Sequence, residues 1–233
     1  MIPVETLISD YQPEAEAVDL LRKTKIVIFC GITGAGKDAV QDIIARSDTF
    51  SRLITSTTRA RRLNGGVMEQ DGKEYYFLSR ERAIDMVRNK DYFEVAYVHG
   101  EINGATVREI RRIHDSGKTA ICDVNYQGVE YYKKHAPGAI AIFLIPPSFE
   151  VWLERLRRRY DSDSEFNQAW PKRRHSAIDE LTWALRSSAC RIVVNDDLQE
   201  CVKASQRIIE GDVFPTGGRQ QAEKILEHLL ESD

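Results

Sequence analysis

The sequence predicts a three-layer α/β fold with a central parallel sheet, a small inserted lobe and a helical lid. Residues 25–30 form a continuous apolar run, which is typical of a parallel strand covered on both faces. Between residues 105 and 210, apolar strand patterns alternate with helical patterns, which favours repeated βα units. Residues 53–98 instead predict three short strands and one helix, which indicates a lobe of about residues 59–104 inserted after the first βα unit.

Composition excludes several classes of protein. The chain has 233 residues and a net charge of −3, so it has no global attraction to nucleic acid or to anionic membranes. Its four cysteines lack CxxC spacing, which favours a reducing compartment over disulfides or zinc ligands. With no long apolar run and no signal pattern at its start, we expect a soluble cytoplasmic protein, either a monomer or a homodimer, without nucleic-acid or membrane partners.

In the first part of the chain, residues 15–22 form an amphipathic stretch that we expect on the outside. The strand at 25–30 is followed by a glycine-rich turn and a helix at 38–45. Next come a β-rich segment at 53–58, a basic loop with a turn at 64–66, and a strand at 75–78. Ser79 is a candidate N-cap for a helix that runs to Asn89, and 92–98 is a strand.

The second part returns to alternating helices and strands. We expect a helix at 105–116 closed by Gly117, strands at 119–124 and 139–145, and a helix at 149–159 capped by Ser148. A polar hinge at 160–170 and a helix from Pro171 to about residue 190 predict a lid. A strand at 191–194, a helix at 197–210 and a loop at 211–218 follow. The tail should dock through Ile225, Leu226, Leu229 and Leu230.

These elements predict the following division of the chain. Residues 1–24 are an N-terminal extension and 25–210 form the main domain. The core of that domain comprises 25–58 and 105–210, the lobe about 59–104, and the lid about 155–175. Residues 211–233 are a C-terminal helical extension.

The main functional signal is the spacing Gly31-x4-Gly36-Lys37 between the first strand and helix, which is that of a Walker A loop. Glycines let backbone N–H groups approach a phosphate, the helix N-terminus adds a positive dipole, and Lys37 adds a mobile charge. Asp38 stands where a Mg²⁺-binding Ser or Thr is usual, so metal becomes necessary to offset its charge beside phosphates. The alternative is a strand, turn and helix that uses glycine only for tight packing.

Three groups of basic residues provide further candidates for phosphate binding, because guanidinium groups clamp phosphoryl oxygens in two-point contacts. A solvated surface is the alternative for each group, and a nucleic-acid patch is disfavoured because no aromatic residues interleave with the arginines. The groups are Arg59, Arg61 and Arg62; Arg155, Arg157, Arg158 and Arg159; and Lys172, Arg173 and Arg174.

An ordered set of motifs across about residues 24–210 resembles the guanylate kinases. The motifs are Thr55-Ser-Thr-Thr-Arg59-x-x-Arg62, Asp71-Gly-Lys-Glu-Tyr75-Tyr-Phe77, Phe93-Glu94, Gly100-Glu-Ile-Asn-Gly104, Asp123-Val-Asn125-Tyr-Gln127-Gly128, Pro146-Pro147-Ser148 and Val194-Asn195-Asp196-Asp197-Leu198. The resemblance implies an enzyme that transfers a phosphoryl group from ATP, with Mg²⁺ as cofactor, to GMP or dGMP.

The resemblance also implies roles for individual residues. Arg59, Arg62 and Tyr75 would hold the acceptor's phosphate, while Glu94 and Thr55 would read guanine. Arg155 or Arg159 and Arg173 or Arg174 would be the lid arginines, with Lys37, Arg159 and Arg173 the catalytic candidates. The expected ATP-binding residues are Gly31, Ile32, Thr33, Gly34, Ala35, Gly36, Lys37, Asp38, Ala39, Arg155 and Asn195, and the metal candidates are Asp38 and Asp123.

Several positions depart from the family pattern. Asn103 replaces a phosphate-binding Tyr, Ala105 replaces a frequent Ser, and Asn125 replaces an Asp near the acceptor. Asn103 and Asn125 remain acceptor-site candidates. Each lost charge-assisted contact would cost about 1.5–3 kcal/mol, so GMP affinity would fall or the acceptor would change.

Two alternatives stay open. The first is a related kinase with another acceptor such as a ribose bisphosphate, because such kinases carry a Gly-Lys-Asp sequence like that at Gly36, Lys37 and Asp38. Tyr75, Glu94 and the Thr-Thr-Arg segment disfavour it. The second is a non-catalytic interaction module, which the intact glycine-rich loop and its lysine disfavour.

Overall fold

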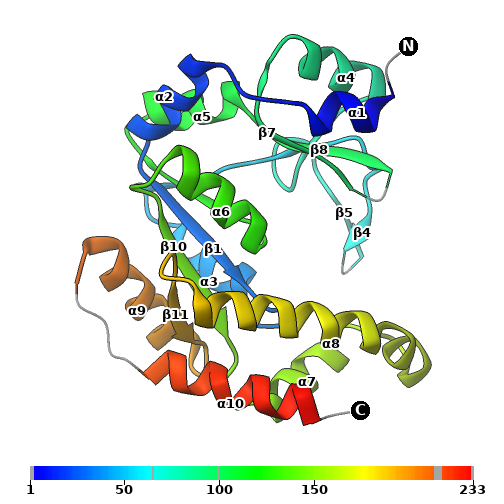
Figure 1. Ribbon diagram of the computed structural model, residues 1–233, viewed down its shortest axis with the longest axis vertical. Helices are drawn as coiled ribbons and strands as arrows, with labels where there is room; N and C mark the ends of the chain where they lie inside the picture. The colour runs from blue at the N-terminus through cyan, green and yellow to red at the C-terminus, as the bar shows by residue number, and fades with distance from the viewer. Residues whose placement is uncertain (1–2, 65, 99, 213–216, 232–233) are drawn as a thin grey trace. The chain divides into compact units, whose positions relative to one another are not determined.

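The computed structural model describes residues 3–64, 66–98, 100–212 and 217–231 (Figure 1). The chain forms two compact units. The first contains Met1–Lys25 and Ser51–Cys122, and the second contains Ile26–Phe50 and Asp123–Asp233. We call them the acceptor unit and the donor unit, after the candidate residues that each contains. No helix in the described ranges is both long and apolar enough to cross a membrane.

A five-stranded sheet in the order β11-β10-β1-β9-β2 forms the centre of the fold, as predicted. Its strands β1 (Ile26–Gly31), β10 (Ile140–Ile145) and β11 (Arg191–Val194) pair in parallel. The other two are β9 (Thr119–Asp123) and β2 (Phe50–Arg52). Side chains of β1 and β10 are almost wholly buried, which explains why both strands are continuous apolar runs.

The donor unit has helical layers around β1, β10 and β11. Helix α3 packs on β1 and against α9, while α6 packs on β1 and α8 (Figure 1). Trp183 of α8 lies with its ring 5.8 Å from Tyr126 and 6.2 Å from Phe143, filling the space between α6 and β10. The bounds are α3 (Lys37–Ile44), α6 (Tyr126–His135), α7 (Phe149–Arg157), α8 (Asp163–Arg186), α9 (Leu198–Glu210) and α10 (Gly217–Glu231).

The acceptor unit is built on a second sheet in the order β6-β3-β8-β7. One face of this sheet packs on α1 and α4, where Tyr92, Ile102, Ala83 and Val87 form a buried cluster. The bounds are α1 (Val4–Ser9), α2 (Ala15–Lys23), β3 (Ser56–Thr57), β4 (Leu63–Asn64), β5 (Val67–Met68), β6 (Tyr76–Phe77), α4 (Arg80–Arg88), β7 (Tyr92–Val98), β8 (Glu101–Thr106) and α5 (Val107–Asp115).

The lobe differs from the prediction in two places. Helix α4 begins after the predicted cap Ser79, whose side chain accepts a hydrogen bond from the N–H of Arg82 at 3.2 Å. Residues 101–106, however, form strand β8, so α5 starts later than predicted, with Thr106 as its N-cap. The basic loop contains the short antiparallel hairpin of β4 and β5. The predicted turn at 64–66 includes residue 65, which lies outside the described residues.

The N-terminal residues contain one helix more than the sequence predicts. Helix α2 covers the predicted amphipathic stretch, whereas α1 was not predicted and packs on β7 and α4. Ile8 and Tyr11 are both 8% exposed and belong to the buried cluster of the lobe. The Tyr11 hydroxyl also donates a hydrogen bond to the backbone oxygen of Tyr92.

The predicted polar hinge at 160–170 is wrong, because most of it belongs to the 24-residue helix α8. Ser162 caps this helix by accepting a hydrogen bond from the N–H of Glu165, and Phe166 is buried. Pro171 lies inside the helix, where proline usually costs about 3 kcal/mol. Ring contacts of Trp170 with Trp152 and Phe166, both at 5.7 Å, help to offset that cost.

The C-terminal helix α10 packs on α8, α7 and β11. Ile225 and Leu229 are fully buried, as expected for a docking face, but Leu230 is 60% exposed and was wrongly placed on that face. Helical geometry explains the difference, because consecutive residues lie about 100° apart around the axis. Half of the predicted loop at 211–218 lies outside the described residues, and its last two residues, Gly217 and Gly218, belong to α10 instead.

Candidate active site

The glycine-rich loop connects β1 to α3 in the donor unit. Gly31, Gly34 and Gly36 have φ values of +131°, +88° and +85°, which side-chain-bearing residues rarely adopt. At Gly31 a Cβ would lie 2.1 Å from the backbone oxygen of Leu144, and at Gly36 it would lie 2.3 Å from Nδ2 of Asn195. Both glycines are therefore required by the fold of the loop, before any phosphate is considered.

The carbonyl groups of this loop are held by the protein. Trp152 Nε1 donates to the oxygen of Thr33 at 2.7 Å, and Asn195 Nδ2 donates to that of Ala35 at 2.8 Å. Among the described residues, the backbone N–H groups of Thr33, Gly34 and Gly36 have no acceptor. Because its carbonyls are fixed and its amides are free, the loop can bind an anion.

Lys37 is the first residue of α3, and its Nζ donates to the oxygen of Gly31 at 2.8 Å. The ammonium group is thus held against the same loop. Of the other candidates here, Ile32 and Ala35 are buried, whereas Asp38 and Ala39 are exposed in the first turn of α3. The loop therefore offers amides, a cation and a helix N-terminus together.

The structure separates the lid candidates by their contacts. Arg173 Nε donates to the Tyr160 hydroxyl at 3.0 Å, whereas Arg174 Nε donates to the backbone oxygen of Leu229 at 2.9 Å. Arg174 therefore fixes the end of α10, whereas Arg173 contacts a side chain that precedes α8. On α7, Arg155 donates to the backbone oxygen of Asn195 at 2.9 Å, while Arg159 is exposed after the helix end.

Asn195 is a support of the loop in this structure. Its side chain is 5% exposed, and its amide is occupied by Ala35. The expected contact with adenine would have to come from another atom of this residue. Asn125, an acceptor candidate, similarly caps α6, because its Oδ1 accepts from the N–H of Gly128 at 2.9 Å.

Glu180 on α8 is a donor-unit residue that sequence analysis missed. Burial raises the pKa of its carboxyl to about 7; the nearby charges of Lys37 and Arg173 lower this pKa and Asp123 raises it. Its Oε1 accepts from Ser176 at 3.4 Å, but its buried Oε2 has no hydrogen-bond partner among the described residues. A buried carboxylate beside Lys37 and Asp123 is typical of functional sites.

The raised pKa of Glu180 predicts a pH-dependent stability. Because the folded state favours the protonated carboxyl, ionisation costs stability as the pH rises from about 4.5 through about 7. Glu180→Gln should therefore raise the free energy of unfolding by about 1–3 kcal/mol near pH 8, and leave it almost unchanged near pH 4.5. Urea titrations at both pH values measure this, with exposed Glu227→Gln as the control. An equal gain at both pH values would contradict the role of ionisation.

The candidate metal ligands Asp38 and Asp123 are both exposed acidic residues of the donor unit. No group of three or more acidic, histidine or cysteine side chains that could hold a metal is found among the described residues. This donor set fits Mg²⁺, which binds through one or two carboxylates together with phosphate oxygens and water.

In the acceptor unit, the candidates share the sheet face opposite α4. Glu94 lies opposite Ala105, and Asn103 lies opposite both Ala96 and Thr57. Side chains two residues apart on a strand point to the same face. Thr55 therefore shares the face of Thr57. Tyr75 shares the face of Phe77, which pairs with Thr57. The structure therefore brings Thr55, Tyr75, Glu94 and Asn103 to one surface.

Arg59 is held over this surface by an ion pair that sequence analysis missed. Its two terminal nitrogens each donate to one oxygen of Glu69 at 2.9 Å, and its Cζ lies 5.3 Å from the Tyr75 ring centroid. These hydrogen bonds hold the pKa of Glu69 below its ordinary value. Glu69 also accepts from the N–H of Arg62, whose side chain is exposed. Glu69 thus positions the guanidinium of Arg59 and the backbone of Arg62, and two neighbouring guanidinium groups are suited to a doubly charged phosphate.

Glu94 differs from Glu69 because no hydrogen bond or ion pair reaches its carboxylate within the described ranges. Burial alone raises the pKa of this carboxyl. The side chain is half-buried, so its carboxylate is only partly hydrated, and a ligand that supplies N–H donors would offset that loss of hydration. The two N–H donors on the edge of guanine would satisfy both of its oxygens. Asn103 lies nearby on β8, but its amide donates to the oxygen of Glu101 at 3.4 Å.

Together the parallel sheet and the glycine-rich loop are those of a P-loop nucleotide-binding protein. A family model described as guanylate kinase matches residues 23–212. A guanylate kinase from Streptococcus thermophilus is 32% identical over 87% of this chain and 91% of its own. One from Clostridium tetani is 30% identical over 82% and 88%. A crystal structure of guanylate kinase from Anaplasma phagocytophilum has a TM-score of 0.58 at 22% identity, covering 90% and 96% of the two chains.

The chain belongs to the guanylate kinase family, which confirms the resemblance found in the sequence. It is accordingly an enzyme of the nucleoside monophosphate kinase class. The structural similarity supports the same fold.

Proposed function

We propose that this chain transfers the γ-phosphoryl group of Mg²⁺-bound ATP to GMP or dGMP. Family membership supports this activity. The observation that carries the choice of acceptor is the half-buried carboxylate of Glu94, which has a raised pKa, lacks a partner among the described residues and shares a face with Thr55 and Tyr75. A guanine base supplies the missing donors, whereas adenine presents no matching pair of N–H groups.

On the acceptor side, Arg59, Arg62 and Tyr75 bind the phosphate of GMP, while Glu94 and Thr55 orient the base. Asn103 and Asn125 contribute to the acceptor site through their amides. One oxygen of the GMP phosphate forms a bond to the γ-phosphorus as the bond from that phosphorus to ADP breaks. No side-chain base is needed, because the attacking phosphate is already ionised.

On the donor side, the loop from Gly31 to Ala39 and residue Asn195 hold ATP. Lys37, Arg159 and Arg173 stabilise the charge that develops during transfer, and Arg155 supports the loop by holding the Asn195 backbone. Asp38 and Asp123 would hold Mg²⁺, which neutralises phosphate charge when bound. We further infer a cytoplasmic location, where both nucleotides are available, and a monomer or homodimer.

A panel of acceptors tests the proposal. Purified protein with Mg²⁺ and ATP should phosphorylate GMP and dGMP and leave AMP, CMP, UMP and a ribose bisphosphate essentially unchanged, as followed by ADP release and product chromatography. Turnover of another acceptor without GMP would contradict the assignment. Failure to bind ATP with Mg²⁺ in calorimetry would favour a non-catalytic module.

A further inference from the structure

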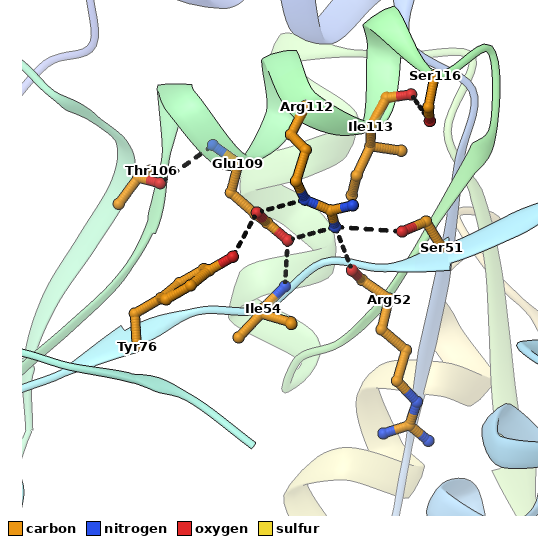
Figure 2. Close-up of polar contacts among 9 residues, drawn as sticks. All are labelled: Ser51, Arg52, Ile54, Tyr76, Thr106, Glu109, Arg112, Ile113 and Ser116. Carbon is orange, nitrogen blue, oxygen red and sulfur yellow. Dashed lines mark hydrogen bonds and ion pairs between the residues drawn. The ribbon is translucent and has the colours of Figure 1, made fainter. Parts of the chain in front are cut away.

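Glu109, near the start of α5, is a buried carboxylate that connects separate segments of the acceptor unit (Figure 2). It is 2% exposed. Its Oε1 accepts from the backbone N–H of Ile54 at 3.1 Å, and its Oε2 accepts from the Tyr76 hydroxyl at 3.2 Å. Arg112 pairs with both oxygens, through Nε at 2.9 Å and Nη2 at 2.7 Å. All of its interactions lie within one compact unit.

Arg112 extends the network to the chain before β3. Its Nη2 donates to Oγ of Ser51 at 3.2 Å and to the backbone oxygen of Arg52 at 3.3 Å (Figure 2). Thr106 caps the start of α5, because its Oγ1 accepts a hydrogen bond from the N–H of Glu109 at 3.2 Å. One ion pair therefore holds the segment 51–54 and strand β6 to the first turns of α5.

The segment 53–55 needs this support because its backbone hydrogen bonds change from β9 to β6 there. Leu53 donates its N–H to the oxygen of Ile121, while the oxygen of Thr55 accepts from the N–H of Tyr76. The N–H of Ile54 lies between these two pairings and has a side-chain acceptor only, which is Glu109. An N–H left without an acceptor would be costly, so Glu109 stabilises this crossing.

Packing does not fix the network by itself. A cavity of about 530 Å³ is lined by Glu109, Tyr76 and Thr106 together with residues of α4. Side chains beside a cavity have fewer contacts to hold their positions than side chains in a filled core. Burial raises the pKa of Tyr76, so its phenol stays protonated and remains a donor.

We propose that Glu109 is a positioning residue for the acceptor site. Glu109 holds Ile54, which precedes Thr55, and Tyr76, which follows Tyr75. Thr55 and Tyr75 contact GMP in the proposed function, on which this inference rests. The backbone N–H of Tyr76 also donates a hydrogen bond to the oxygen of Thr55, so the segments that contain Thr55 and Tyr75 are joined directly. Loss of the Glu109 carboxylate therefore displaces both Thr55, which contacts the base, and Tyr75, which contacts the phosphate. The ATP-binding loop belongs to the other unit and should be unaffected.

Steady-state kinetics separate this role from a purely structural one. Glu109→Gln should raise KM for GMP roughly 10-fold or more, because small displacements of binding groups have large kinetic effects. KM for ATP should stay within about twofold of the wild-type value, since the donor loop is unchanged. Tyr76→Phe, which removes one hydroxyl and keeps the ring, should show the same selective change to a smaller extent, and serves if Glu109→Gln does not fold.

The control is Asp85→Asn on α4, where Asp85 pairs with Arg88 in the same three-residue spacing but with side chains 59% and 53% exposed. It should leave both KM values unchanged. A lower melting temperature with unchanged KM for GMP, or equal increases in both KM values, would overturn the proposal. If the wild-type protein does not use GMP, the proposed function fails separately, and the same selective effect is then measured with the acceptor that the panel identifies.

Discussion

Lys37→Met should lower kcat for GMP phosphorylation by about 100- to 1,000-fold, since removing one preorganised group that stabilises transition-state charge typically has this effect. Phosphoryl transfer depends on such stabilisation because the protein supplies no covalent chemistry. Lys37 starts α3, and its Nζ is held 2.8 Å from the oxygen of Gly31, beside amides that have no acceptor in the described part of the loop. Initial rates at saturating ATP and GMP measure the loss.

The control variant is Lys203→Met on α9, where the lysine is exposed and pairs with Glu200 at 2.8 Å. Both variants should keep a free energy of unfolding within about 1 kcal/mol of the wild-type value, because neither lysine packs in the core. Wild-type kcat in Lys37→Met would mean that this loop is not where the transferred phosphoryl group is stabilised.

Much of the fold could be predicted because its signals are local. Strand β7 and strand β11 have the predicted bounds, and α4 begins after its predicted cap Ser79. In each case the signal lies in the segment itself: residues of high β propensity in the strands, and a side-chain cap at the helix start. The central strands β1 and β10 were found for the same reason, since burial on both faces requires continuous apolar residues.

Elements that depend on distant partners were missed. Strand β8 contains Asn103 and Gly104, which are poor strand formers, yet it lies between β3 and β7 and pairs with both. Gly104 is required there, because a Cβ would lie 2.4 Å from the backbone oxygen of Glu94. Helix α8 was broken at Pro171 in the prediction, whereas aromatic packing of Phe166 and Trp170 keeps it continuous.

The candidate site likewise has residues that the sequence predicts and residues that only tertiary contacts identify. The glycine-rich loop is a local motif. The acceptor residues were assigned by family resemblance, and four of them, Thr55, Tyr75, Glu94 and Asn103, lie on one sheet face. The residues that hold them in place could not be predicted. Glu69, Glu109 and Glu180 occur in ordinary polar surroundings in the sequence, and their roles arise from tertiary contacts such as the pairing of Tyr76 with Glu109, 33 positions away. Only burial and partners identify such carboxylates.

Gly31→Ala should lower the free energy of unfolding by about 4 kcal/mol or more, even without nucleotide. Gly31 has a φ of +131°, and an added Cβ would lie 2.1 Å from the oxygen and 2.8 Å from the nitrogen of Leu144. Those atoms belong to the backbone of β10, which pairs directly with Gly31, so relief requires a shift of a central strand. Urea denaturation measures the loss, or soluble yield if the variant is too unstable to purify.

Gly138→Ala is the matched control, because this exposed glycine has no neighbouring atom within 4 Å of an added Cβ and no positive φ. It should leave stability within about 0.5 kcal/mol of the wild-type value. The comparison separates two reasons for the first glycine of the motif, namely close approach of a phosphate and close approach of a strand. If Gly31→Ala kept its stability but bound ATP more weakly, phosphate approach would be the reason. A loss of stability in the absence of nucleotide instead assigns the requirement to Leu144, so that in this chain sheet packing determines the start of the phosphate-binding loop.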